Sequence, residues 1–135
     1  MRIAVDTSVV VAAFGAWHEA HDAARAVVEQ GAMLPAHSAL ETYSTLTRLP
    51  DPFRAPAPVV ADFLRHWFEG RWLFADRETL MALPARLAEL RITGGSSYDA
   101  LIGLTAQDSD AVLWTLDHRA GRTYRQLGID HMFAS

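Results

Sequence analysis

The sequence contains no cysteine and no lysine, and each absence removes a class of chemistry. Without cysteine there are no disulfides, no thiolate metal ligands and no cysteine nucleophile, which suits a protein of the cytoplasm. All 12 basic residues are arginine, so no reaction that needs a lysine amine can take place. A phosphate-binding loop with the GxxxxGK[ST] pattern is excluded for the same reason.

Long apolar runs are missing as well. No stretch of 18 uninterrupted apolar residues occurs, so we expect no membrane-spanning segment. Asp6 interrupts the apolar N-terminal run and no small-residue cleavage site follows it, so we expect no signal peptide. The net charge of −4 disfavours a general nucleic-acid-coating surface, and any contact with nucleic acid must therefore be local.

The composition that remains is that of a globular protein. Of the 135 residues, 50% are hydrophobic and 21% are charged. This length fits one compact core, and no internal repeat, low-complexity block or long linker divides it. We expect a single domain over residues 1–135.

Short apolar segments typical of buried strands alternate with segments typical of helices. The expected strands are RIAV (2–5), AMLPA (32–36), RWLFA (71–75), AVLWTL (111–116) and an edge strand in IDHMF (129–133). Ser38 and Glu41 fit a capping box at a helix start, and Pro84 is expected to break a helix or restart it. This alternation predicts an α/β fold, a three-layer sandwich with a central parallel sheet of four to five short strands covered by helices.

Four acidic residues fall where ligands bind in such a fold. Asp6 and Asp117 directly follow two of the expected strands, and Glu41 and Asp99 lie in the first turns of two expected helices. In an open parallel sheet, ligands bind outside the carboxyl ends of the strands. We therefore expect these carboxylates at one edge of the sheet.

Each acid has a second interpretation, because Asp and Glu also cap helices or complement the helix dipole. Four acids gathered together repel one another, by about 4 kcal/mol for a pair about 4 Å apart at an effective dielectric near 20. With no lysine to offset that repulsion, a divalent cation with oxygen ligands is the natural partner, either Mg²⁺ or Mn²⁺. Thr115 lies on the same side of its strand as Asp117 and either positions a water or is an ordinary strand threonine.

The sequence resembles the PIN-domain family, and more narrowly the VapC-type toxins of type II toxin–antitoxin modules. The segments that carry the resemblance are VDTSVVVAAF, SALETYSTLTRLP, GGSSYDALIGLTAQD and LWTLDHRAGRTYRQLG, and they run nearly from end to end. The resemblance implies a metal-dependent endoribonuclease that cuts RNA, forms a homodimer and pairs with a VapB-like antitoxin. It makes Asp6, Glu41, Asp99 and Asp117 the catalytic and metal-binding quartet, with Thr115 as an accessory hydroxyl.

Other interpretations stay open. A PIN-like module without catalysis, binding nucleic acid or protein, is the main alternative. A phosphatase of the D-x-D type would need an acid at position 8, where Ser8 stands.

The aromatic segment 63–74 is interpreted as core and subunit interface, with an exposed remainder that suits an antitoxin helix. His18 and His21 are a weak metal signal, interpreted as a solvated helix start. Five arginines are candidates for contact with RNA: Arg48, Arg54, Arg119, Arg122 and Arg125.

Overall fold

The structure, a computed structural model, describes residues 1–135 and consists of five short strands and seven helices. The strands are β1 (Arg2–Val5), β2 (Leu34–Pro35), β3 (Trp72–Leu73), β4 (Ala111–Thr115) and β5 (His131–Phe133). The helices are α1 (Thr7–Phe14), α2 (His21–Val28), α3 (Ala36–Thr47), α4 (Ala57–Trp67), α5 (Arg77–Leu90), α6 (Ser96–Asp108) and α7 (His118–Gln126). None of these helices is both long and apolar enough to cross a bilayer.

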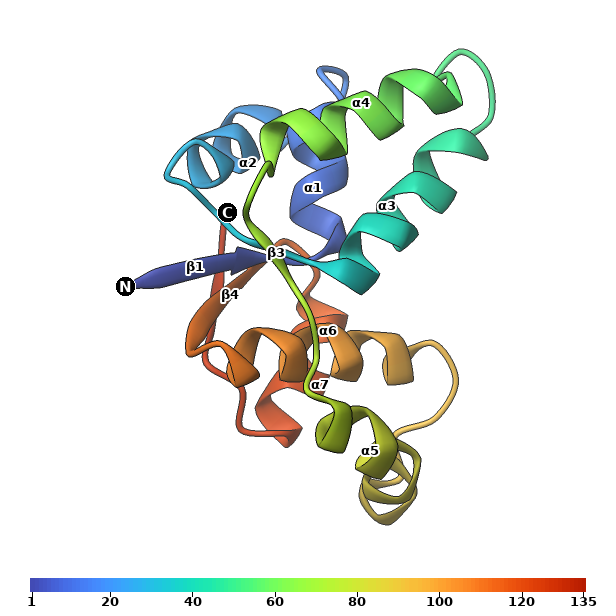
Figure 1. Cartoon of the computed structure of the whole chain (residues 1–135). Coiled ribbons are helices and arrows are strands. Elements are labelled where there is room, and N and C mark those ends of the chain that lie inside the picture. The colour runs from blue at the N-terminus through green and yellow to red at the C-terminus, as the bar shows by residue number, and fades with distance from the viewer.

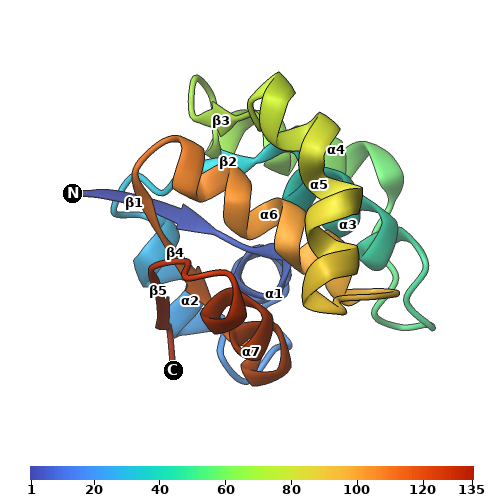
Figure 2. The same cartoon turned by 90° about the horizontal axis from the view of Figure 1, so that it is seen from below.

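All strand pairs are parallel. Strands β1, β4 and β5 form one ladder and β2 and β3 form another, and a parallel bridge between Ala4 and Met33 joins the two. The spatial order is therefore β3-β2-β1-β4-β5, which can be followed in Figure 2. Helices α1 to α4 cover one face of the sheet and α5 to α7 cover the other (Figure 1). The predicted three-layer α/β fold with a parallel sheet is confirmed.

The hydrophobic core consists of two clusters of buried residues, one of 16 and one of 15. Successive residues of a strand point to opposite faces, so Val5 joins the first cluster while Ala4 joins the second. In the same way Leu113 belongs to the second cluster and Trp114 packs against the first. Strand β1 is thus buried on both faces, and this burial fixes the position of Asp6, the residue that directly follows the strand.

Two local predictions are wrong, the capping box at Ser38 and the break at Pro84. Helix α3 begins at Ala36, directly after Pro35 at the end of β2, so Ser38 lies inside the helix and forms no capping box with Glu41. Helix α6 likewise begins without a side-chain cap. Helix α5 continues through Pro84, because Leu83 and Leu87 are buried in the second core cluster and hold the helix on both sides of the proline. Glu41 and Asp99 are therefore not used as helix caps.

The segment 63–74 is divided between core and surface. Leu64, Phe68 and Leu73 are buried, which agrees with the interpretation of this segment as core. Trp72 and Phe74 remain exposed, by 39% and 66% respectively. An apolar surface is therefore left at the β3 edge of the sheet.

Candidate active site

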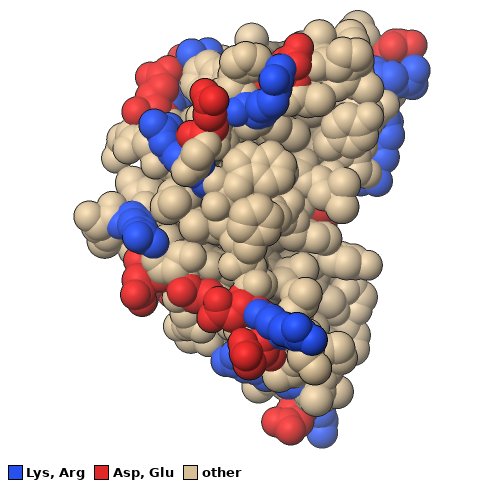
Figure 3. Space-filling view, viewed as in Figure 1, with Lys and Arg blue, Asp and Glu red and all other residues tan.

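The four predicted acids line one pocket, with a volume of about 680 Å³, at the carboxyl ends of β1 and β4. Asp6 and Asp117 come from the two strand ends, Glu41 comes from α3, and Asp99 comes from the first turn of α6. In the space-filling view the right edge of the molecule is notched between the upper and lower helices, and part of an acidic residue shows inside the notch (Figure 3). The topology thus gathers carboxylates that are far apart in the sequence.

Asp6 is the most rigidly held of the four. Its side chain is only 3% exposed and caps α1, since Oδ1 accepts hydrogen bonds from the backbone N–H of Ser8 (3.1 Å) and Val9 (3.4 Å). The Ser8 hydroxyl donates to the same oxygen at 2.5 Å, and the Tyr124 hydroxyl donates to Oδ2 at 2.8 Å. Burial raises the pKa of Asp6, and the hydroxyl groups of Ser8, Thr115 and Tyr124 oppose that rise.

Asp117 also caps a helix. Its Oδ1 accepts from the backbone N–H of Arg119 at 2.9 Å and of Ala120 at 3.2 Å, at the start of α7. Thr115 is fully buried behind it, and its hydroxyl accepts from the backbone N–H of Asp117 at 3.0 Å. The same hydroxyl lies 3.4 Å from Oγ of Ser8. Thr115 therefore connects Asp117 to the group that holds Asp6, and it does not form part of the pocket wall.

Glu41 is positioned by two side chains. The hydroxyl of Thr7 donates to Oε1 at 2.9 Å, and Nε2 of His37, one turn earlier on α3, lies 3.7 Å from Oε2. The nearby His37 lowers the pKa of Glu41, and the Thr7 hydrogen bond lowers it further. Sequence reasoning missed His37, although its spacing of four residues from Glu41 places both on one face of a helix.

Asp99 shows most directly that the acids act on one another. Its side chain is 15% exposed, and its Oδ2 atom is buried without a hydrogen bond. Burial raises the pKa of Asp99 to about 6; Arg119 opposes the rise, and the negative charges of Asp117, Asp6 and Glu41 add to it. A neighbouring cation would remove the cost of keeping this carboxylate ionised.

Arg119 is the one arginine in the pocket. Its Nη1 atom lies 3.3 Å from Oδ2 of Asp99, and its Nη2 atom lies 3.4 Å from Oδ2 of Asp117. The other four candidate arginines do not line the pocket. Because Arg119 is 54% exposed and touches only two of the four acids, it offsets their repulsion in part. His18, interpreted from the sequence as part of a solvated helix start, instead lines this pocket.

The ligand atoms and the negative charge of the pocket suit a divalent cation. No three His, Asp or Glu side chains stand close enough together to form a complete ligand set in this arrangement. The donors are nevertheless carboxylate oxygens, which Mg²⁺ and Mn²⁺ prefer, and the buried Oδ2 of Asp99 forms no hydrogen bond, although Arg119 lies near it. The pKa of Asp99 is raised first by burial and then by the charges of the other three acids, and a cation held in the pocket would oppose both effects.

Tyr124 is a second residue that sequence reasoning missed. It is fully buried in α7, and its hydroxyl reaches Asp6 across the core. Burial, followed by the charge of Asp6, raises the pKa of Tyr124 well above its ordinary value, so the phenol keeps its proton and acts as a donor. No signal in the sequence distinguishes Tyr124 from an ordinary buried aromatic residue of a helix.

Comparison with known proteins gives matches along nearly the whole chain. Residues 3–126 match the family described as the PIN domain. Ribonuclease VapC40 of Mycobacterium tuberculosis is 45% identical over 128 residues, which cover 95% of this chain and 96% of that protein. Ribonuclease VapC27 of the same species is 40% identical over 134 residues, which cover 98% of this chain and 97% of that protein.

Solved structures with the same fold are more distant in sequence. A chain of FitAcB from Neisseria gonorrhoeae superposes with a TM-score of 0.71 at 16% identity, covering 98% of this chain and 97% of that one. A chain of FitAB bound to an IR36 DNA fragment superposes with a TM-score of 0.69 at 15% identity, covering 98% and 94%. At this level of identity the superposition describes the fold alone.

Proposed function

The chain belongs to the PIN-domain family, among relatives of the VapC type, and from this premise we propose that it is a metal-dependent endoribonuclease acting as a toxin. The family match confirms the resemblance found in the four sequence segments. Two curated relatives that align over nearly their full length are named ribonucleases. The observation that carries the proposal is the set of four carboxylates in one pocket, where the pKa of Asp99 is raised to about 6.

We assign Mg²⁺ to this pocket, with Mn²⁺ as the alternative ion. Asp6 and Asp99 would hold the ion, and Glu41 and Asp117 would contribute directly or through water. A divalent cation there would neutralise phosphate charge and lower the pKa of a water for hydrolysis. The buried Oδ2 atom of Asp99, which forms no hydrogen bond, and the raised pKa of that carboxyl support this assignment.

The remaining groups of the pocket would orient the acids and the RNA. Ser8 and Tyr124 fix both oxygens of Asp6, so its carboxylate cannot rotate away when the substrate enters. Thr115 fixes the backbone at Asp117. The exposed guanidinium of Arg119 is within reach of a phosphate oxygen that approaches the acids. The expected reaction is in-line hydrolysis of an RNA phosphodiester bond.

A nuclease assay tests this function. The wild-type chain should cut single-stranded RNA in Mg²⁺ and stop when EDTA is added. Asp6→Asn and Asp99→Asn should each abolish cleavage while the circular dichroism spectrum stays that of the wild type. Asp62→Asn is the matched control, because Asp62 is exposed on α4 and pairs only with Arg65. Cleavage at the wild-type rate by either pocket variant would contradict the assignment.

The alternative, a PIN-like module that binds RNA or protein without catalysis, predicts a different result. Such a module would bind RNA equally well in EDTA and would cut nothing in Mg²⁺. The acidic pocket argues against it, because four clustered carboxylates repel the phosphates of RNA unless a cation intervenes.

We further propose that the chain pairs with a VapB-like antitoxin in the cytoplasm and forms a homodimer. The FitAB neighbour, solved with a DNA fragment, supports the expectation of a partner protein. Co-expression with a small reading frame next to this gene should yield a complex that purifies together and does not cut RNA. If the chain purifies from that co-expression alone and still cuts RNA, the proposed pairing with an antitoxin is contradicted.

A further inference from the structure

We propose that Tyr98 is a stacking platform for a nucleobase next to the phosphate that is cut. The inference rests on the proposed ribonuclease function and adds a base-binding subsite beside the acids. It is carried by three features of Tyr98: its exposure at the pocket, the His37 ring stacked on it, and an apolar hollow that it also lines.

The first feature is the position of the side chain. Tyr98 directly precedes Asp99 on α6, and its side chain lines the acidic pocket. More than half of its surface, 52%, is exposed, although an aromatic ring in a folded protein gains most by burial. A base that stacks on this ring therefore belongs to a nucleotide whose phosphate lies at the acids.

The second feature is the support of the ring. The imidazole of His37 stacks on Tyr98 with the ring centroids 5.1 Å apart and the planes within 5° of each other. His37 is in turn held beside Glu41 on α3, so the stack links α3 to α6 next to two residues that line the pocket, Glu41 and Tyr98. His37 thus packs against one face of the Tyr98 ring and sets the orientation of that ring before a ligand arrives. This preorganisation lowers the entropy cost of binding a base.

The third feature is a hollow of about 470 Å³ between α5 and α6, to which Tyr98 also contributes. Its walls are mainly aliphatic, with Leu83, Leu87 and Leu101 among them, and Thr93 and Ser97 supply hydroxyl groups. Tyr98 is the side chain shared by the hollow and the acidic pocket. The two sites together match a nucleotide, with an anionic group at one end and a flat apolar base at the other.

The charge of the chain makes such a base contact necessary. The net charge is −4 and Arg119 is the single arginine in the pocket, so few arginine contacts with the RNA backbone are available there. Stacking on an aromatic ring is independent of charge and tolerates every base. The structure therefore assigns the local affinity for RNA largely to Tyr98.

The test measures RNA binding and cleavage with variants of Tyr98. Binding of a fluorescent single-stranded 12-mer RNA pool in Mg²⁺ is followed by anisotropy in the non-cutting Asp6→Asn background. Tyr98→Leu, which keeps an apolar side chain against His37, should weaken binding about 10-fold, as expected for the loss of one stacked base. Tyr98→Trp should restore it. Phe53→Ala is the control, because Phe53 is a ring of similar exposure (45%) that does not line the pocket.

A second substrate separates base stacking from a role in folding or in positioning Glu41. Cleavage sites of the wild-type enzyme are located by sequencing the products, and RNAs with an abasic ribose on either side of the cut are then compared. Tyr98→Leu should cut the intact RNA about 10-fold more slowly than the wild-type enzyme does. On the RNA that lacks the stacked base, the variant and the wild-type enzyme should cut at the same rate.

Each other outcome overturns the inference. Equal losses on intact and abasic RNA would show that Tyr98 only positions the acids, and wild-type binding by Tyr98→Leu would show that no base stacks there. In both cases the Mg²⁺-dependent cleavage by the wild-type enzyme would still support the nuclease. If the wild-type chain neither binds nor cuts RNA, the proposed function and the base platform fail together.

Discussion

Asp99 is destabilising in the folded protein when no cation is bound, and removing its charge should show this. Its pKa is raised to about 6 from an ordinary value of 3.8. The raised pKa of Asp99 therefore does not change the unfolding free energy well below pH 3.8. It lowers the unfolding free energy increasingly as the pH rises from 3.8 to about 6, and by a constant amount above that. We expect Asp99→Asn to stabilise the metal-free protein by about 2 kcal/mol at pH 7.5, measured by urea unfolding in EDTA.

The same variant has two internal controls. Near pH 3 the difference in unfolding free energy between Asp99→Asn and the wild type should nearly vanish, because the wild-type carboxyl is then largely protonated in both the folded and the unfolded state. At pH 7.5 added Mg²⁺ should raise the melting temperature of the wild type but not that of the variant. A variant less stable than the wild type in EDTA would show that Asp99 is not under electrostatic strain.

Tyr124 should matter both for stability and for cleavage. Its hydroxyl is the donor to Oδ2 of the buried Asp6, and Phe at this position leaves that oxygen without a partner. We expect Tyr124→Phe to lower the unfolding free energy by about 1–3 kcal/mol at pH 7.5 and less at pH 4, where Asp6 can take up a proton. Cleavage should slow through kcat more than through KM, because the RNA-binding surface is intact. An unchanged kcat would mean that Ser8 alone holds Asp6 in place.

Helices α6 and α7 approach each other closely at Gly103, and this contact supports Tyr124. A Cβ atom at position 103 would lie 2.5 Å from Cδ1 of Ile129 and 3.1 Å from Cδ1 of Tyr124. We expect Gly103→Ala to destabilise the protein by about 1–3 kcal/mol through overpacking, despite the better helix propensity of alanine. Because the clash displaces Tyr124, cleavage per folded molecule should fall as well.

A control for this prediction lies at the start of the same helix. Nothing lies within 4 Å of a Cβ added at Gly95, where the backbone has φ −61°. Gly95→Ala should therefore change the urea midpoint little. A Gly103→Ala protein as stable as Gly95→Ala would show that α7 shifts away from α6 without cost.

The elements that the sequence predicted well are those whose signal is local. The strand segments at 2–5 and 111–116 are short, apolar and bounded by polar residues, and both appear as parallel strands. The capping box predicted for α3 is absent, because the helix begins directly after Pro35 and the S-x-x-E pattern therefore falls inside it. The continuity of α5 through Pro84 depends on packing against the core, which no local pattern reports.

In the candidate site, too, some residues could be predicted from the sequence and others could not. The four acids could be predicted because the topology of a parallel sheet puts strand ends and helix starts at one edge. His37, Tyr98 and Tyr124 could not, because each acts through a contact with a residue that is distant in space or on another element. Their roles depend on side-chain geometry, and a histidine or tyrosine in a helix has the same appearance in sequence whether or not it makes such a contact.

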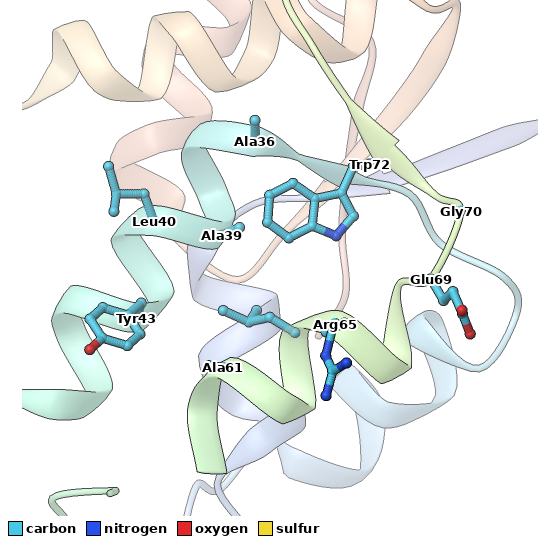
Figure 4. A pocket seen from close by; sticks show the side chains of 10 residues that line it. Ala36, Ala39, Leu40, Tyr43, Ala61, Arg65, Glu69, Gly70 and Trp72 are labelled. Carbon is cyan, nitrogen blue, oxygen red and sulfur yellow. The ribbon is translucent and has the colours of Figure 1, made fainter. Parts of the chain in front are cut away.

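We expect the apolar surface at the β3 edge to be the face that binds a second copy of the chain. A groove of about 590 Å³ between α3 and α4 is lined by Leu40, Tyr43 and Trp72, and Figure 4 shows the indole of Trp72 lying over it. Leu40 is 64% exposed. Figure 3 shows a broad area without charged side chains over β3, between two charged margins. Exposed apolar area of this kind marks a protein interface.

The charges of the groove favour a symmetric partner. Arg65 and Glu69 lie on the same wall of the groove (Figure 4), and a two-fold axis through the interface can set each of them against the opposite charge on the other subunit. A homodimer through this face also keeps the acidic pocket open, because the groove and the pocket share no lining residue.

We therefore expect the chain to be a dimer at micromolar concentration and Leu40→Glu to make it a monomer, as measured by light scattering after size-exclusion chromatography. The substitution would bury a carboxylate without a partner on both subunits, and the cost of desolvating these two charges opposes association. Met132→Glu is the matched control, since Met132 is 51% exposed on β5, at the opposite edge of the sheet, and should stay dimeric. A monomer for Met132→Glu with a dimer for Leu40→Glu would place the interface at the β5 edge, where two subunits would pair their outermost strands.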